Sequence, residues 1–326
     1  MRAAYYESNG PARTVLRVED VPTPTPGGGE VRVKLIASGV NPSDVKSREG
    51  RTRKIAYPRV IPHSDGAGVI EAVGNGVNKA RIGERVWIWN AQWKRADGSC
   101  AEYVVLPEAM AVPLPAHISF EEGACLGIPA MTAYQAVASA EAWAGSTLLV
   151  SGGAGGVGHY VIQFAKARGA VCIATVSSEA KAALARQAGA DHTIDYKRED
   201  VGARVLDLTD NAGVDAVIEM DLSANAKLYP RVLRPRGLAV IYGMGTPEPA
   251  IPAQWMLVNA ITLKFIFVYE LTPEERAAAI SEINRMLETK TLINNVAKTF
   301  PLSEIVAAHE AVEGGQVPGN VVVSIA

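Results

Sequence analysis

The feature that most constrains this chain is the segment at residues 148–170, LLVSGGAGGVGHYVIQFAKARGA. An apolar run typical of a buried strand leads into a glycine-rich turn, and the turn leads into a run with the apolar spacing of an amphipathic helix. Gly153, Gly155 and Gly158 match the pattern GxGxxG between a strand and a helix, which is the context that this pattern requires. The segment therefore predicts a strand–turn–helix unit that binds a dinucleotide.

The backbone of the turn gives the physical reason for this prediction. Glycines permit a tight bend and let the main chain approach a pyrophosphate, while the exposed N–H groups at the helix N-terminus bind its negative charge. A glycine-rich turn without a ligand is the alternative, and the flanking strand and helix favour the binding site. We predict that the diphosphate is held by Ala154, Gly155, Gly156 and Val157.

Two patterns divide the chain into domains. From about residue 123, apolar β-like runs alternate with helical stretches, which predicts a parallel sheet covered by helices on both faces. The preceding residues contain short apolar runs interrupted by Pro and Gly, which is typical of a compact β domain. After Tyr269, a helix with Thr272 as its N-cap is expected before the chain returns to β-like runs. The expected segments are a first domain at 1–122, a parallel-sheet domain at 123–270 and a return segment at 271–326 that completes the first domain.

Composition excludes several classes of partner. The net charge is −2 and hydrophobic residues make up 48% of the chain, so no nucleic-acid or membrane-surface partner is expected. We see no secretory signal at the N-terminus and no apolar run long enough to cross a bilayer. Cys100, Cys125 and Cys172 are widely spaced and form no CxxC pattern, which argues against disulfides and against a cysteine-rich zinc lobe. A reducing cytoplasm is therefore the expected compartment.

The residues after the second strand of the parallel sheet bear on which dinucleotide binds. An NAD site usually has Asp or Glu there, which accepts hydrogen bonds from the ribose 2′-hydroxyl. This chain instead has Ser177 and Ser178, followed by Glu179 and then Lys181. Hydroxyl donors and a cation suit a 2′-phosphate, so the sequence favours NADPH. Ser178 also fits a helix N-cap, and Glu179 would repel a phosphate if its side chain turned toward it.

Ordered motifs extend along nearly the whole chain: ASGVNPSDVKSR, PHSDGAGVIEAVG, GERVW, AEYVVLP, AGGVG, DYKRED and a closing HEAVEGG…GNVVVSI. On these motifs the chain resembles the medium-chain dehydrogenase/reductase superfamily, in its zinc-free quinone oxidoreductase (zeta-crystallin-like) branch. The resemblance implies a GroES-like β-barrel catalytic domain plus a Rossmann domain, a doubly wound parallel sheet, with the active site in the cleft between them. It also implies NADPH as cofactor, a small electrophilic carbonyl compound as substrate, and a homodimer or homotetramer that pairs through the edge strand TLKFIFV.

The resemblance also assigns cofactor contacts to individual positions. Lys181 and Tyr196 match positions that contact the 2′-phosphate in relatives that use NADPH, and Ser177 lies in the same predicted pocket. An arginine that often completes this pocket is absent, because the matching stretch at 313–316 reads Glu-Gly-Gly-Gln. The residues that the resemblance places around the nicotinamide are Thr132, Gly243, Met244, Phe267 and Val268.

The ligand positions of the zinc enzymes in the same superfamily are not matched. Those enzymes have a cysteine in the segment that corresponds to SGVNPSD, where this chain has Asn41. Aligned on the following GAG, their metal-binding histidine becomes Ser64, and the loop of four closely spaced cysteines is missing. Since zinc needs three or four suitably spaced ligands, no metal site is expected. His63, close to Asp65, is interpreted as a structural or surface-cleft histidine, and His309 receives the same interpretation.

A reductase without a metal needs hydrogen-bond donors to stabilise negative charge on the substrate oxygen. By the resemblance, Asn41 lies near the nicotinamide and the substrate, and it is equally a turn residue because Asn-Pro favours turns. Lys46 stands where relatives often have tyrosine. As a candidate catalytic residue it supplies a hydrogen-bond donor or a proton, and the alternative is a solvated lysine. Gln92 and Trp93 lie in a predicted loop and are candidates for substrate contact, whereas Trp87 is expected in the barrel core.

Several functions fit these features. The leading one is NADPH-dependent reduction of quinones or related conjugated carbonyl compounds. An enoyl or alkenal (double-bond) reductase on the same scaffold is the first alternative, and a non-catalytic NADPH-binding protein is the second. A zinc alcohol dehydrogenase is a more distant possibility. The sequence does not separate the two reductases, because the substrate pocket in such folds is built from loops.

Overall fold

The computed structural model describes residues 1–325 and divides into two compact units. The first unit consists of Met1–Pro129 and residues 280–325, and the second consists of Ala130–Ala279. The C-terminal segment from residue 280 belongs to the first unit. Both boundaries lie further along the chain than the sequence estimate, and the second one lies within helix α11 (Pro273–Glu288).

The first unit is built on a seven-stranded sheet with the order β14-β15-β3-β4-β5-β7, in which β6 also pairs with β3. The long strand β3 alternates buried and partly exposed side chains along its first half, and Val31, Val33 and Leu35 enter the core. Its C-terminal end pairs antiparallel with β15, the last strand of the chain. The strands are β3 (Glu30–Val40), β4 (Asp65–Val73), β5 (Arg85–Ile88), β6 (Tyr103–Pro107), β7 (Ala111–Pro113), β14 (Val296–Pro301) and β15 (Asn320–Ser324).

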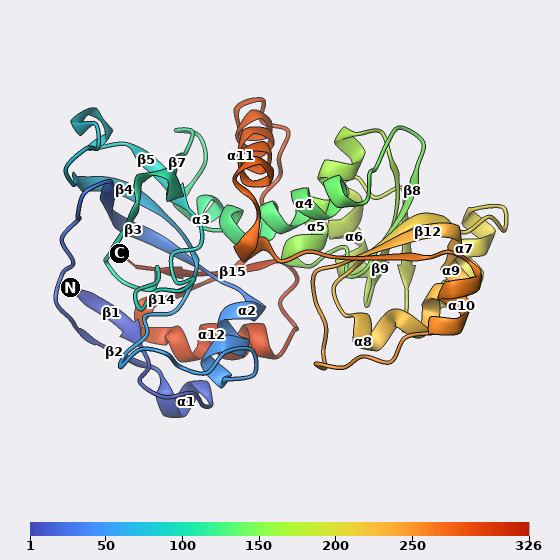
Figure 1. The fold of residues 1–326 in the computed structure, drawn as a ribbon, viewed down its shortest axis with the longest axis horizontal. Helices are drawn as coiled ribbons and strands as arrows, with labels where there is room; N and C mark the ends of the chain where they lie inside the picture. The colour runs from blue at the N-terminus through green and yellow to red at the C-terminus, as the bar shows by residue number, and fades with distance from the viewer. Residues whose placement is uncertain (326) are drawn as a thin grey trace. The chain divides into compact units, whose positions relative to one another are not determined.

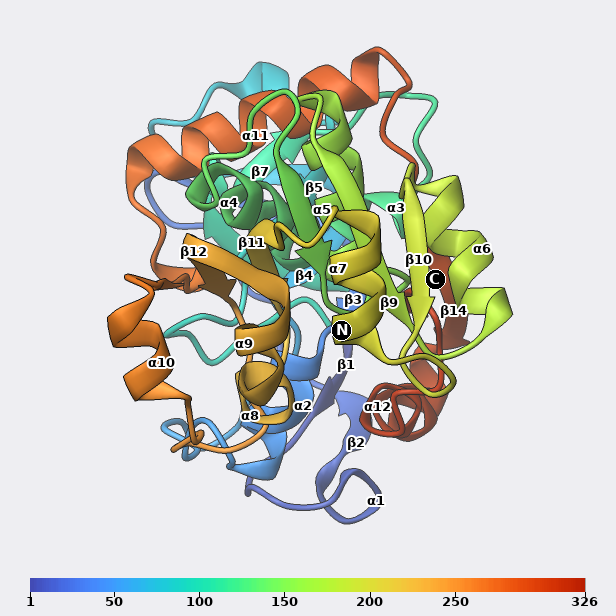
Figure 2. The same ribbon diagram turned by 90° about the vertical axis from the view of Figure 1, so that its right-hand side faces the viewer.

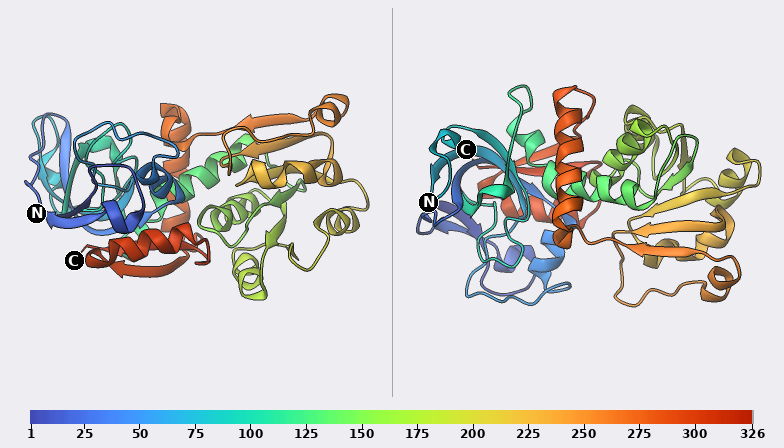
Figure 3. Two further views of the ribbon diagram at one scale, coloured as in Figure 1. Left: turned by 90° about the horizontal axis from the view of Figure 1, so that it is seen from below. Right: turned by 45° about the horizontal axis from the view of Figure 1, so that its top comes forward.

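A two-stranded antiparallel pair and several short helices surround this sheet. Helix α12 lies against β14 and β15, as the left view of Figure 3 shows. Buried apolar residues of β1, α1, α12 and β15 form one continuous cluster, so both chain ends pack into the same core. The elements are β1 (Arg2–Tyr5), β2 (Arg17–Asp20), α1 (Ala12–Val15), α2 (Pro42–Glu49), α3 (Phe120–Gly123) and α12 (Ile305–Glu313).

The second unit is a six-stranded parallel sheet with the order β10-β9-β8-β11-β12-β13. Numbered along the chain, this is the order 3-2-1-4-5-6 of a doubly wound dinucleotide-binding sheet. Its central strands are almost entirely buried and rich in Val, Ile, Leu and Ala, as expected for a sheet covered on both faces. The strands are β8 (Thr147–Val150), β9 (Val171–Val176), β10 (His192–Asp195), β11 (Val214–Glu219), β12 (Leu233–Ile241) and β13 (Thr262–Phe265).

Helices cover this sheet on its two faces, with α4, α5 and α6 in one layer and α7, α8 and α9 in the other (Figures 1 and 2). Helix α11 begins as predicted, because Thr272 and Glu275 exchange the two hydrogen bonds of a capping box, at 2.9 and 3.2 Å. The helices are α4 (Met131–Ser139), α5 (Gly156–Ala167), α6 (Glu179–Gln187), α7 (Val201–Leu208), α8 (Leu222–Asn225), α9 (Tyr229–Val232) and α10 (Ala253–Val258).

Within residues 1–325, no helix combines the length and the apolar character that crossing a membrane would require.

Candidate functional site

The glycine turn joins β8 to α5 at the point of the second unit's sheet where the strand order reverses, between β8 and β11. Gly155 caps α5, and its carbonyl accepts the His159 N–H at 3.0 Å. The N–H groups of Gly156 and Val157 therefore precede the first hydrogen bond inside the helix and point out of its N-terminus. The turn that the sequence predicted is confirmed, and its backbone offers donors to an anion at the carboxyl edge of the sheet.

Two glycines of this turn have different reasons to lack a side chain. A Cβ on Gly158 would meet the backbone of the turn itself, within 2.9 Å of the Gly152 carbonyl carbon and 3.0 Å of the Gly153 Cα. A Cβ on Gly155 would meet only the Gly152 carbonyl oxygen, at 3.2 Å, and the Gly155 φ of −74° suits any residue. Close packing of the helix on the strand therefore requires Gly158, whereas the fold alone requires Gly155 much less.

The carboxyl ends of β9 and β10 bring together the residues predicted to distinguish the cofactors. The Tyr196 N–H donates to the Val176 carbonyl at 3.1 Å, so Tyr196 lies beside the segment that begins at Ser177. Ser178 caps α6 by accepting the Lys181 N–H at 3.3 Å, which confirms the N-cap interpretation. The Lys181 ammonium forms no ion pair with any residue in the described range 1–325.

The structure also settles where the Glu179 carboxylate points. Its side chain is exposed and bonds to the Arg186 guanidinium along the outer surface of α6. The negative charge of Glu179 is thus paired with Arg186, and that of Asp195, beside Val176, with Arg198. The end of β9 itself carries hydroxyls followed by a cation. This arrangement fits a phosphate better than a ribose 2′-hydroxyl.

The remaining predicted cofactor residues also lie in the second unit. Thr132 is buried on α4 and Val268 is buried after β13, while the Phe267 ring is about half exposed and packs against the Tyr269 ring, with centroids 5.2 Å apart. Gly243 follows β12, and a Cβ there would collide with the Met220 backbone at the end of β11. Met244 comes next in the same loop and packs against the apolar cluster beside β11 and β12. The contacts that we predicted between these residues and a nicotinamide stay predictions.

Sequence reasoning missed Glu219, a buried acid at the carboxyl end of β11. Its carboxylate accepts hydrogen bonds from the Asp221 N–H at 2.7 Å, the Asn225 amide at 2.9 Å and the Ser151 hydroxyl at 3.2 Å. Burial outweighs these donors and raises its pKa. Glu219 therefore ties the loop after β8 to the loop after β11 and fixes the edge at which the glycine turn lies. Its position at the end of the run VDAVIE was the only signal in the sequence.

Asn41, the predicted catalytic amide, lies in the first unit at the N-terminus of α2. It forms a capping box with Asp44, whose carboxylate accepts the Asn41 N–H at 2.8 Å. Its side-chain amide donates to Asp65 at 2.7 Å, and both residues are buried. Asn41 thus has the structural role of a turn residue at the start of α2. One N–H of its side-chain amide has no partner among residues 1–325.

Burial governs the charges around Asn41. It raises the pKa of Asp44 to about 7 and raises the pKa of Asp65 well above its usual value, with the neighbouring Asp44 carboxylate adding to the effect on Asp65. Burial therefore favours the neutral form of Asp65, which orients the Asn41 amide by accepting its hydrogen bond. A substrate oxygen near Asn41 would meet an amide donor that is already held in place.

The other predicted residues of the first unit divide into two groups. Lys46 is half-buried on α2, in the last turn of that helix. Gln92 and Trp93 line a cavity of about 240 Å³ together with Arg53. The Gln92 amide is engaged at both ends, since it accepts from Arg53 at 2.7 Å and donates to the Arg95 carbonyl at 2.9 Å. One face of the Trp93 ring is covered by the Arg53 guanidinium, 4.8 Å from the ring centroid.

Trp87 packs in the core, as expected. Its side chain is fully buried on β5, and its indole N–H donates to the Asn284 side chain at 3.3 Å. It therefore serves the packing of the first unit.

His63 and His309 form a pair that the sequence did not reveal. Their Nε2 atoms lie 3.0 Å apart and their rings stack with centroids 5.1 Å apart, although the residues are 246 positions apart in the chain. His63 Nδ1 also contacts the Ser38 hydroxyl at 2.8 Å, and the whole group is buried. Both histidines are buried in the core. They are therefore structural histidines, and neither lies in a surface cleft.

This pair predicts a pH dependence of stability. Burial lowers the pKa of His63 to about 3 and the pKa of His309 well below its usual 6.5. A histidine with a lowered pKa stabilises the fold above the pKa of the unfolded chain, and this contribution is lost as the pH falls. For a histidine that stays neutral in the fold down to pH 5, the loss between about pH 7.5 and about pH 5 is about 2 kcal/mol.

A His309→Gln variant isolates this contribution, because Gln can bond to His63 and does not titrate. Buried carboxyl groups are common to both proteins and cancel in the comparison. We expect urea unfolding to show the stability advantage of the wild type shrinking by about 2 kcal/mol between these two pH values. An advantage that stays constant would show that the fold does not lower the pKa of His309.

The side chains present do not fit a zinc site. Within residues 1–325, no group of three or more His, Cys, Asp or Glu side chains is placed to hold a metal ion. The position of Ser64 supplies only a hydroxyl, and the His63 Nε2 is already paired with His309. The three cysteines are free and buried.

Two family models match the chain. One, described as a zinc-binding dehydrogenase, matches residues 156–285, and one described as an alcohol dehydrogenase GroES-like domain matches residues 27–116. A protein named quinone oxidoreductase from Pseudomonas aeruginosa is 33% identical over 314 residues, which are 94% of this chain and 95% of that protein.

Solved structures share the fold over the full length. A mycobacterial protein complexed with NADPH is 29% identical with a TM-score of 0.89, covering 99% of this chain and 100% of the other. The structure of an NAD-dependent alcohol dehydrogenase is 30% identical with a TM-score of 0.91 and covers all of both chains. The two neighbours thus differ in the cofactor that their names state.

Proposed function

Because the chain belongs to the medium-chain dehydrogenase/reductase superfamily, in its quinone oxidoreductase branch, we propose that it is a zinc-independent reductase that transfers a hydride from NADPH to quinones or related conjugated carbonyl compounds. The observation that carries the proposal is that one edge of the sheet has both the glycine turn, after β8, and a group formed by Ser177, Lys181 and Tyr196. The turn offers backbone donors to a diphosphate, and the group offers hydroxyls and an uncompensated cation to a 2′-phosphate.

The choice of NADPH over NAD rests on what the end of β9 lacks. An NAD site uses an acidic side chain there. Of the two acids near the end of β9, Glu179 bonds to Arg186 on the outside of α6, and Asp195 accepts the Lys197 N–H and pairs with Arg198. The missing C-terminal arginine of related pockets lowers the expected strength of the preference without reversing its direction.

The chemistry divides between the cofactor and the protein. When bound, NADPH supplies the hydride from its reduced nicotinamide ring. Negative charge then develops on the acceptor oxygen, where the open N–H of Asn41 supplies a hydrogen bond. Asp65 and the capping box hold this amide in one orientation, so its donor needs no rearrangement during the reaction. Water can protonate the reduced product, since the proposal assigns no dedicated acid.

One screen tests this function. Purified protein is treated with a chelator, its zinc content is measured, and oxidation of NADPH and NADH is followed with 1,2- and 1,4-quinones, enones, alkenals and alcohols. We expect chelated protein to oxidise NADPH with quinones at the rate of untreated protein. Preferential turnover of alkenals would favour the double-bond reductase, and tight NADPH binding without turnover would favour the non-catalytic protein. Activity that requires zinc would reject the proposal.

Lys181→Ala tests the cofactor preference directly. A charge-assisted hydrogen bond contributes about 1.5–3 kcal/mol, so we expect the Kd of NADPH to rise about tenfold or more while the Kd of NADH stays within about twofold. Lys227→Ala removes an exposed lysine of the same unit and serves as the control. Equal weakening of both cofactors by Lys181→Ala would show that Lys181 does not contact the 2′-phosphate.

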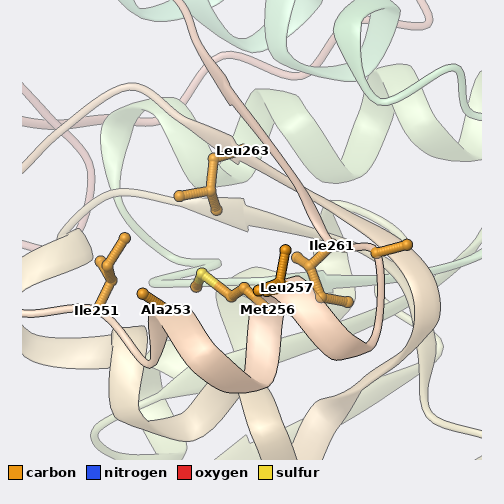
Figure 4. Close-up of a pocket in the computed structure, with 7 residues that line it drawn as sticks. Ile251, Ala253, Met256, Leu257, Ile261 and Leu263 are labelled. Atoms are coloured by element: carbon orange, nitrogen blue, oxygen red, sulfur yellow. The ribbon is translucent and has the colours of Figure 1, made fainter.

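The edge of the second unit's sheet supports a proposed homodimer or homotetramer. Strand β13 ends the sheet, and the neighbouring helix α10 exposes Leu257 and Val258 to 80% and 73%. Leu257 lines an apolar hollow with Ile251, Met256 and Leu263, as Figure 4 shows. An unpaired edge beside exposed apolar side chains favours association with a second copy.

Sedimentation velocity tests this association. We expect a mass of at least twice the 34.5 kDa of one chain. Leu257→Asp should shift the protein toward the single chain, whereas Ile82→Asp, at an exposed apolar residue of the first unit, should not. A wild-type protein that sediments only as one chain would contradict the proposal.

The cytoplasmic location predicted from the sequence also remains a proposal.

A further inference from the structure

The cavity of about 240 Å³ in the first unit has a cationic lining. Arg53, Lys54 and Lys94 line it, and none of its lining residues is acidic. Apolar contact surface comes from Tyr6 and Val60. The volume lies below the roughly 300–1,000 Å³ of pockets that hold drug-sized ligands, so it suits a compound of one or two rings.

Arg53 is held in place by neutral groups. Its guanidinium donates to the Ser47 hydroxyl from Nε at 3.2 Å and from Nη2 at 3.1 Å, and to the Gln92 side-chain oxygen at 2.7 Å. It lies over the Trp93 ring, 4.8 Å from the centroid. Within residues 1–325, Arg53 has no carboxylate partner in an ion pair, and its Nη1 has no hydrogen-bond partner. No carboxylate of the described residues offsets the guanidinium charge in an ion pair, and the two N–H groups of Nη1 remain to bind a carboxylate or sulfonate oxygen.

Asp44 and Tyr6 offset the charge of Arg53 only in part. Asp44 lies near enough for Arg53 to lower its pKa, but burial is the larger effect and leaves that pKa at about 7. Its carboxylate is also directed to the Asn41 N–H. Burial raises the pKa of the Tyr6 hydroxyl to about 12, so Tyr6 faces the cavity as a neutral donor.

We propose that this cavity is the acceptor subsite and that it selects flat conjugated acceptors carrying a carboxylate or sulfonate, with the anionic group bound by Arg53 and the ring lying against Tyr6 and Val60. Trp93 then acts as the platform that orients Arg53, and Gln92 as a second support. This assignment rests on the proposed function for the identity of the ligand as a hydride acceptor. It adds a charge preference that the reductase function does not require.

Binding without the cofactor gives the first test. Calorimetry compares 2-naphthoate with 2-naphthamide, which have the same shape and differ in charge. We expect wild-type protein to bind the acid at least about tenfold more tightly, as a charge-assisted hydrogen bond predicts. Arg53→Gln should remove the preference, Arg53→Lys should keep part of it, and Arg51→Gln, an exposed neighbour, should leave it unchanged. Equal binding of the two compounds by the wild type would overturn the proposal.

Turnover gives the second test and separates the two proposals. NADPH oxidation is followed with 1,4-naphthoquinone and with its 2-sulfonate. We expect Arg53→Gln to raise the KM for the sulfonate about tenfold or more and to change the KM for the neutral quinone by less than about twofold. Equal changes for both quinones would overturn the charge selection. Absence of turnover with both quinones in the wild type, together with a retained preference for naphthoate, would reject the reductase function and keep the anion subsite.

Discussion

Replacing Gly158 with alanine is expected to weaken NADPH binding by about a hundredfold or more, because the added Cβ collides with the backbone that forms the turn. The collision displaces the N-terminus of α5 from the end of β8, and the backbone donors of Gly156 and Val157 move with it. Loss of two charge-assisted hydrogen bonds, at about 1.5–3 kcal/mol each, accounts for the size of the effect. Fluorescence titration with NADPH and NADH measures it, and both cofactors should be affected equally.

Two further variants separate damage to the fold from loss of the ligand. Gly28→Ala places a Cβ no closer than 3.7 Å to any neighbour, at an exposed residue of the first unit without a positive φ, and should behave as wild type. Gly155→Ala also leaves the turn almost free of collisions, so its melting temperature should match the wild type within a few degrees. If the turn holds a diphosphate, Gly155→Ala should still lose at least about tenfold in affinity. Normal NADPH binding by both turn variants would contradict the assigned site.

Replacing Asn41 with serine is expected to lower kcat by about a hundredfold while leaving the protein folded. Serine is as good an N-cap as asparagine, so α2 should keep its first turn. It cannot, however, donate to Asp65 and to a substrate oxygen at the same time, as the two N–H groups of the Asn41 amide can. The loss should appear in kcat with a little-changed Kd for NADPH.

Asp65→Asn is the matched control for this experiment. Because burial favours the neutral form of Asp65, an amide of the same shape can accept the Asn41 hydrogen bond in its place. We expect Asp65→Asn to keep most of the activity and of the stability. If Asn41→Ser retained wild-type kcat, the amide of Asn41 would have only its structural role at the N-terminus of α2.

Local patterns in the sequence were sufficient for the architecture of both units. The apolar run before the glycines became β8, the periodic run after them became α5, and Thr272 and Ser178 cap helices as predicted. These features depend on residues a few positions apart, where spacing and side-chain chemistry decide the backbone. The exact domain boundaries differ, because α11 continues across the second one and no turn signal marks the crossing.

Contacts between residues far apart in the chain could not be predicted from the sequence. The pairing of His63 with His309, the bond from Asn41 to Asp65 and the position of Arg53 over Trp93 each join separate segments of the chain. Each also sets a charge or an orientation, which spacing alone does not determine. The side-chain direction of Glu179 could not be predicted either, because it depends on the hydrogen bond from Arg186. The structure therefore adds to the candidate site mainly the partners that orient its side chains.

The central claim is that a nicotinamide held by the turn after β8 delivers its hydride to a conjugated acceptor without a metal. The most direct measurement is a single turnover of zinc-depleted protein with NADPH carrying deuterium on one or the other face of C4, with an enone as acceptor. One of the two labelled cofactors should transfer its deuterium to the reduced carbon of the product and slow NADPH oxidation by a primary isotope effect. Product without deuterium from either cofactor, or turnover that returns only when zinc is restored, would contradict the claim.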